Sequence, residues 1–224
     1  MINITAGVHL PGKDMAVRFG ANAHAGIGHT IKFKKGFIFA YDVNYLFGQT
    51  VKEPQLLQNV LTTPDSVGNK YAISKIGALT NPRVWERGIQ SHVSIGKLLF
   101  KAGPNENSGF FFTVGAGMLL YKIRIEDIGN NVPQLSKENI KGYDRLTSGF
   151  STKEFIGYMY LHNKRRLSMM AGFEFVQGFT KSMRGYNYDT QTYDTQQRLD
   201  LLNGFKVGVI IPLYKKIPNS FYYY

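Results

Sequence analysis

Long runs in which apolar side chains alternate with small or polar ones constrain this chain more than any other feature. In FIFAYDVNYLF (37–47), aromatic or β-branched residues fill every second position, and Asp42 and Asn44 lie on the opposite face. The same period of two runs through LSMMAGFEFVQGFT (167–180) and RLDLLNGFKVGVIIPL (198–213). This period is typical of β-strands whose two faces meet different surroundings. We therefore expect a chain built from long strands.

The alternation predicts eight strands, most of them about 12–16 residues long against a usual length of about 5–6. Their expected ranges are 1–10, 20–33, 36–48, 84–99, 109–125, 147–162, 166–181 and 197–213. Long connections (11–19, 49–83, 126–146 and 182–196) alternate with short ones (34–36, 101–108 and 163–165). Short turns at one end and long loops at the other are typical of bacterial outer-membrane barrels. We expect a barrel over 1–213 and a basic, aromatic tail over 214–224.

The less apolar face indicates whether this barrel meets water or lipid. A soluble exterior is roughly 25–35% charged, whereas Glu174 is the only charge on its face of LSMMAGFEFVQGFT (167–180). Mostly small residues on that face suit the lumen of an eight-stranded barrel, which side chains just fill. The predicted fold class is all-β, an eight-stranded antiparallel up-and-down transmembrane β-barrel with a side-chain-filled lumen. A soluble, lipocalin-like barrel is the alternative.

The composition narrows the cellular setting. No run of 18 apolar residues is present, which excludes a transmembrane helix. The absence of cysteine excludes disulfides and thiolate metal sites. The start, MINITAGVHL, does not have the pattern of a signal peptide. We expect an outer-membrane protein of bacteria whose signal peptide has been removed.

The whole chain carries a net charge of +12, and its positive charges are concentrated at the short-turn end of the expected barrel. The expected basic rim comprises Lys32, Lys34, Lys35, Lys97, Lys101, Lys164, Arg165, Arg166, Lys215 and Lys216. Such side chains can reach toward lipid phosphates, or they can form a docking surface for an acidic periplasmic protein. A ring at a membrane boundary is not the groove with interleaved aromatics that binds nucleic acid. The expected partners are therefore membrane lipids and outer-membrane or periplasmic proteins.

Charged residues on the predicted inner face form a second candidate site. Its members are Asp42, Glu154, Glu174, Asp200 and Lys206. An unpaired charge in a filled lumen is costly, so we expect these groups to pair with one another. Paired carboxylates for acid–base chemistry are the alternative interpretation.

The sequence gives little support for catalysis. His92 with Ser94 on the same face, or with Ser91 on the other, is the nearest approach to a nucleophile and base. Neither a G-x-S-x-G elbow nor an HExxH motif is present. We predict no catalytic residue, metal site, cofactor or small-molecule substrate.

Two further segments have an expected role. GYDRLTSGF (142–150) offers an ion pair and turn hydrogen bonds through Asp144, Arg145 and Thr147, which is typical of a loop anchor at the barrel rim, and a partner-binding loop is the alternative. The C-terminal residues Phe221, Tyr222, Tyr223 and Tyr224 form an aromatic run that favours a membrane interface.

Several stretches together resemble outer-membrane β-barrel proteins of the Bacteroidota. They are RFGANAHAGIG, VWERGIQSHVSIGKL, NSGFFFTVGAGMLLYKIRIE, KGYDRLTSGFSTKEFIGY, AGFEFVQGFTKSMRGYNYDT and the ending RLDLLNGFKVGVIIPLYKK with FYYY. The resemblance implies an exported barrel without enzyme activity. It further implies an accessory or scaffold subunit of an outer-membrane complex, with the type IX secretion translocon as the leading setting. Barrel-assembly or nutrient-uptake machinery is the first alternative, and a small lipid-modifying enzyme is the alternative from another class.

Overall fold

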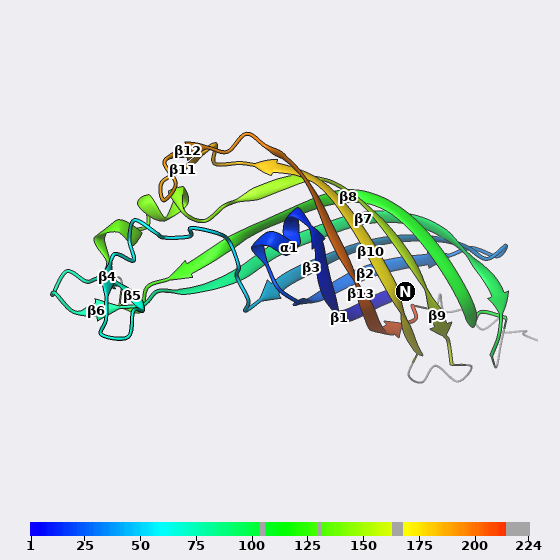
Figure 1. Cartoon of the computed structure of the whole chain (residues 1–224). Coiled ribbons are helices and arrows are strands. Elements are labelled where there is room, and N and C mark those ends of the chain that lie inside the picture. The colour runs from blue at the N-terminus through cyan, green and yellow to red at the C-terminus, as the bar shows by residue number, and fades with distance from the viewer. Residues whose placement is uncertain (104–105, 130, 163–167, 214–224) are drawn as a thin grey trace, which may run out of the picture.

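Backbone pairing runs around a complete ring of antiparallel strands in the computed structural model (Figure 1), which describes residues 1–103, 106–129, 131–162 and 168–213. The ring strands are β1 (Ile2–Lys13), β2 (Asn22–Lys32), β3 (Phe37–Gly48), β7 (Arg83–Lys101), β8 (Gly109–Glu126), β9 (Thr147–Tyr160), β10 (Ser168–Ser182) and β13 (Gln197–Ile211). Each pairs with the ring strands before and after it in the chain. The ring closes where β1 pairs with β13, from Ile2 opposite Ile211 to Lys13 opposite Asp200.

The long connections gather at one end of the barrel, on the left in Figure 1, and the N-terminus lies near the other end. They contain α1 (Asp14–Arg18), β4 (Thr63–Pro64), β5 (Lys70–Ile73), β6 (Leu79–Thr80), η1 (Pro133–Leu135), η2 (Asn139–Gly142), β11 (Tyr186–Asn187) and β12 (Thr192–Tyr193). All eight predicted strands are present, with shifted edges. The predicted loop over 11–19 is instead the end of β1 followed by α1, because β1 continues to pair with β13 beyond its last pair with β2, His9 opposite Asn22.

The outward face of the ring is an apolar belt. Its exposed side chains include Ile4, Val8, Ile27, Phe39, Tyr41, Ile89, Ile95, Phe112, Val114, Phe150, Ile156, Phe173, Phe175, Phe205 and Val207. A closed barrel with such a belt satisfies every strand backbone group while facing hydrocarbon. The prediction of an eight-stranded antiparallel up-and-down transmembrane β-barrel with a side-chain-filled lumen is confirmed. None of the helices in the described ranges has the length and apolar character needed to cross a membrane.

Three layers of side chains fill the lumen. At the long-loop end, Leu46, Leu119 and Leu202 pack with Met15 and Phe19 of the α1 region. At the short-turn end, a second apolar cluster contains Ile38, Leu98, Phe111, Phe155, Met159, Leu161 and Ile210. Buried polar and charged side chains occupy the space between these layers. A cavity between the polar layer and the short-turn cluster, lined by Asp42 and Lys153 on one side and Phe111 and Met159 on the other, has a volume of only about 50 Å³, which is consistent with a packed lumen.

The close approach of β7 and β8 gives the first testable prediction. A Cβ atom on Gly117 would lie 1.8 Å from the backbone oxygen of Ser91, so Gly117→Val should block pairing there and reduce the folded barrel. Folded barrel should migrate faster in unboiled than in boiled samples on detergent gels, and Gly117→Val should diminish the fast band. Ala116→Val is the matched control, because Ala116 is the outward-facing neighbour. Equal mobility of boiled and unboiled wild-type protein would contradict the barrel.

Candidate functional site: a charged lumen beneath a cross-linked loop cap

The centre of the lumen holds four charged side chains from four strands, which we call the lumen charge network: Asp42 (β3), Lys153 (β9), Glu174 (β10) and Lys206 (β13). The Lys206 Nζ atom donates to Glu174 Oε2 at 2.8 Å and lies 3.8 Å from Asp42 Oδ2. Lys153 donates to Asp42, and its Nζ lies 3.9 Å from Glu174 Oε2. Two cations therefore alternate with two carboxylates, which balances charge in a buried site.

Two stacked histidines adjoin the network. His9 Nε2 lies 3.1 Å from Glu174 Oε1, His24 Nε2 lies 3.9 Å from the same oxygen, and the ring centroids are 4.4 Å apart. One ring nitrogen of each histidine and a Glu174 oxygen all lie within 4.8 Å of one another, the spacing of a potential metal site. The Lys206 ammonium already binds the other Glu174 oxygen, so a divalent cation would face a second positive charge nearby. The charges present favour a hydrogen-bonded network at this position.

The nearest serine–histidine pair differs from the one considered in the sequence. His92 Nε2 lies 2.9 Å from Ser151 Oγ, while Ser91 faces outward and its hydroxyl donates to the Tyr41 hydroxyl at 3.4 Å. His92 Nδ1 has no hydrogen-bond partner among the described residues. A catalytic base is normally oriented by a third group. His92 and Ser151 are also enclosed in the lumen, away from lipid headgroups.

The structure brings together Asp42, Glu174 and Lys206 of the five predicted lumen residues. Asp200 is also buried, but it accepts hydrogen bonds from Tyr121 and Thr180 nearer the loop end.

The placement of Glu154 in the lumen was wrong. Glu154 faces outward, where its Oε2 accepts a hydrogen bond from Gln177 Nε2 at 2.8 Å. The physical reason lies in β9, whose inward side chains near the short turns are Phe155 and Met159, part of the apolar lumen layer. Polarity therefore does not mark the inner face of this strand. Lys153 was missed for the same reason, because it shares the face of Phe155 and Met159, which the apolar-outward pattern of the other strands assigns to lipid.

Buried ion pairs join the four long connections into one cap over the long-loop end. Arg18 Nε lies 2.8 Å from Glu53 Oε2, and Arg145 Nε lies 3.1 Å from Glu53 Oε1. Arg145 Nη2 also donates to Asp189 Oδ1 at 2.6 Å. Arg18 Nη2 lies 3.5 Å from Asp194 Oδ2. We call Arg18, Glu53, Arg145, Asp189 and Asp194 the cap network.

Asp194 shows the electrostatic effect of this network. Burial alone would raise the pKa of Asp194, but the hydrogen bond and charge of Arg198 and the charge of Arg18 outweigh it and hold that pKa below its ordinary value. The carboxylate is thus stabilised in its charged form. Its contribution to cap stability is fully present above the ordinary pKa and is lost as the pH falls through the lowered folded-state pKa.

Strained backbone concentrates in the same region. Among the described residues, those other than glycine with a positive φ are Lys13, Gln55, Leu57, Arg145 and Gln191. All of them lie at the long-loop end, and Leu57 is held there by its backbone N–H, which donates to Asp189 Oδ2 at 3.1 Å. Strained residues persist only where the surrounding contacts fix them. The predicted loop anchor at 142–150 matches this placement, although Asp144 binds Arg184 rather than Arg145.

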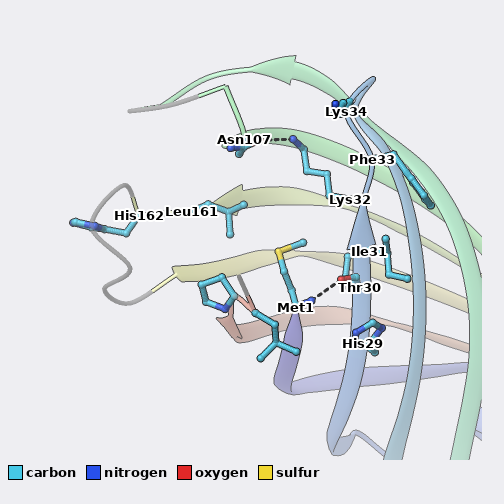
Figure 2. A pocket seen from close by; sticks show the side chains of 12 residues that line it. Met1, His29, Thr30, Ile31, Lys32, Phe33, Lys34, Asn107, Leu161 and His162 are labelled. Carbon is cyan, nitrogen blue, oxygen red and sulfur yellow. Dashed lines mark hydrogen bonds between the residues drawn. The ribbon is translucent and has the colours of Figure 1, made fainter. Parts of the chain in front are cut away.

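Two residues of the basic rim, Lys32 and Lys34, line a hollow at the short-turn end (Figure 2). Its volume is about 600 Å³, and Lys32, Lys34 and His29 contribute to its wall. Lys32 Nζ donates to Asn107 Oδ1 at 2.6 Å, and the N-terminal amine donates to the Thr30 backbone oxygen at 2.8 Å.

The remaining rim residues differ in their surroundings. Lys97 lies over the Phe37 ring at 5.4 Å, Lys101 lies 3.5 Å from Glu106, and Lys35 is exposed in the turn after β2. Lys164, Arg165, Arg166, Lys215, Lys216 and the tail Phe221, Tyr222, Tyr223 and Tyr224 lie outside the described residues.

Comparisons with known proteins add only a general likeness. No protein-family model and no curated protein matches the chain. Among solved structures, neisserial surface protein A (NspA) aligns over 92% of this chain and 93% of its own, with 11% identity and a TM-score of 0.41. The outer membrane protein OprG from Pseudomonas aeruginosa aligns over 92% of this chain and 94% of its own, with 11% identity and a TM-score of 0.37. Likeness at this level carries no argument about function, so the architecture rests on strand pairing and the apolar belt.

Removing one cation of the lumen charge network should destabilise the barrel strongly. Lys206→Met leaves Glu174 without its closest charged partner in a buried site, which costs about 3–5 kcal/mol. Urea titration of the protein refolded in phospholipid vesicles would measure this loss. Lys97→Met, at an exposed rim position, should change stability by less than about 1 kcal/mol. Equal stability of both variants would show that the network does not hold the barrel together.

Opening the cap network should expose the long loops to protease. Arg145→Ala leaves Glu53 and Asp189 without a shared partner, and we expect cleavage within 49–82 to accelerate by about tenfold or more while the ring strands stay protected. Lys137→Ala removes an exposed cation from another long loop and serves as control. Unchanged cleavage of the Arg145 variant would mean that the loops are held by their apolar contacts alone.

Proposed function

We propose that the protein is a non-conducting outer-membrane barrel that acts as an accessory or scaffold subunit of a membrane protein complex. The observation that carries this proposal is the packed lumen. Two apolar layers flank the lumen charge network, and a cavity beside that network has a volume of only about 50 Å³. Such an interior leaves no continuous path for solute, so the function of the barrel lies on its surfaces.

The outer membrane is the location that the architecture supports best. A closed barrel with an apolar belt, short turns at one end and long loops at the other is the pattern of bacterial outer-membrane proteins. In that orientation the basic rim faces the periplasm and the cap faces outward. Lys32, Lys34 and Lys35 could then contact an acidic periplasmic partner, lipid phosphates or both.

The resemblance of the sequence to barrels of the Bacteroidota makes the type IX secretion translocon our leading proposal for the complex. The cap supports a docking role, because buried ion pairs hold four loops in one arrangement before any partner binds. Barrel-assembly or nutrient-uptake machinery is the alternative setting, since the same surfaces would serve a subunit of either.

A lipid-modifying enzyme is the competing class. The enclosed His92–Ser151 pair is its strongest support, and the unpartnered Nδ1 atom of His92 argues against it. His92→Ala should leave the lipid composition of the outer membrane unchanged if the protein is a scaffold. Altered acyl-chain composition in that variant would favour the enzyme.

Isolation from native membranes tests the scaffold proposal directly. We expect the affinity-tagged chain, extracted in mild detergent, to elute in a complex of fixed stoichiometry with subunits of the type IX translocon. Subunits of the assembly or uptake machinery would support the alternative settings. Recovery of the barrel as a monomer under conditions that preserve other outer-membrane complexes would contradict a subunit role.

A further inference from the structure

A chain of polar side chains crosses the lipid-facing wall of β9 and β10. Gln177 Nε2 donates to Glu154 Oε2 at 2.8 Å, and the Thr152 hydroxyl donates to Gln177 Oε1. Thr152 and Glu154 are two positions apart on β9 and share its outward face, opposite the lumen-facing Lys153. We call Thr152, Glu154 and Gln177 the wall polar chain.

The wall polar chain lies within the apolar belt and not at either rim. Strand pairing places Val114 of β8 and Phe175 of β10 beside Glu154. Both have exposed, outward side chains, at 41% and 39%. Along β9 itself, Phe150 and Tyr158 face outward four positions to either side of Glu154, or about 13 Å along the strand. Apolar or aromatic side chains therefore flank Glu154 on both neighbouring strands and bound the wall polar chain along β9.

A carboxylate in this position is costly in lipid. Charged side chains on the lipid face of a barrel destabilise it most at mid-membrane depth, and ionisable groups inside membranes by default indicate a functional site. Among the described residues, Gln177 is the only side chain with a hydrogen bond to the Glu154 carboxylate. An ionised carboxylate can accept several hydrogen bonds. The group therefore retains capacity for a further donor.

Outward-facing residues of the other strands show how far the polar surface around the wall polar chain extends. Asn203 on β13 is exposed and pairs with Phe175, so it extends the polar surface one strand further. The wall on the opposite side of the ring, β2, presents Ala25, Ile27, His29 and Ile31 outward, with His29 toward the short-turn end. Ser91 and Tyr41 form an uncharged outward pair on β7 and β3, so within the described part of the belt the outward carboxylate is confined to β9, as expected for a face that meets one protein and not lipid all round.

We propose that the wall over β9 and β10 docks a membrane-embedded segment of a partner protein, and that this segment presents a Lys or Arg side chain to Glu154. The inference deepens the proposed function and rests on it. The argument is charge complementarity, because the wall polar chain offers an acceptor that needs a cationic donor. A second copy of this chain fits less well, because a two-fold contact through this wall would bring two Glu154 carboxylates together.

Folding in vesicles without any partner gives the first test. Refolded into dilauroylphosphatidylcholine vesicles, Glu154→Leu should fold with an equilibrium constant about 3- to 10-fold larger than the native chain, because the cost of a carboxylate in lipid is removed. Val114→Leu, an apolar exchange at the neighbouring outward position, is the control and should leave the constant unchanged. A less stable Glu154→Leu barrel would mean that the wall polar chain is a structural requirement, which would overturn the proposal.

Photo-crosslinking in native outer membranes gives the second test. The chain contains no cysteine, so Phe175→Cys can carry a single maleimide–benzophenone probe beside Glu154. We expect one protein adduct whose crosslinked peptide is a transmembrane segment with a Lys or Arg. The adduct should disappear when Glu154→Gln or Glu154→Leu is added, although both variants still give the heat-modifiable folded band. Ile27→Cys on the opposite wall should give no such adduct.

The outcomes separate this inference from the scaffold proposal. Persistence of the adduct in Glu154→Gln, an adduct with twice the 25.3 kDa mass of this chain, or labelling of lipid alone would each overturn the inference. If the native complex is isolated intact while any of these results is obtained, the scaffold proposal stands and only the docking wall is wrong. If no complex is isolated and no adduct forms, both are wrong.

Discussion

Closure of the ring between β1 and β13 is the constraint on which the rest of this structure depends. Hydrocarbon offers no hydrogen-bond partners, so each strand must find its partners in its neighbours and the last must pair with the first. The unbroken register from Ile2 with Ile211 to Lys13 with Asp200 meets this requirement. Once closed, eight strands fix a lumen that side chains just fill. Outward positions must then suit lipid, and inward positions must suit one another.

The inward side chains suit one another because they are separated into layers along the lumen. Apolar clusters close both ends, and the charged residues between them are balanced two against two. Each carboxylate of the lumen charge network contacts lysines from two other strands, so the pairing ties distant parts of the ring together. One hypothesis is that buried charges of this kind make the chain adopt a single arrangement. Removing one charge of such a pair destabilises the protein strongly.

The sequence was sufficient to predict the strands and their pairing order, because a period of two repeated over long runs admits few alternatives. It was also sufficient to place Asp42, Glu174 and Lys206 in the lumen, since on β3, β10 and β13 the exposed face is plainly apolar. It failed on β9, where Phe155 and Met159 point inward and Thr152 and Glu154 outward, so hydrophobicity does not separate the faces. The cap network was beyond prediction, because Arg18, Glu53, Arg145 and Asp189 come from four separate connections.

The misplaced Glu154 and the missed Lys153 of β9 have opposite consequences. Lys153 completes the internal charge balance, so the barrel has what it needs for stability without help from outside. Glu154 contributes nothing to that balance, because it faces away from the lumen and its hydrogen-bond partner Gln177 does so too. In pure lipid the outer carboxylate only lowers stability, whereas against a cationic partner it becomes one half of an ion pair in a low-dielectric setting. Stability of the isolated barrel and association with another protein therefore make opposite demands on this one position.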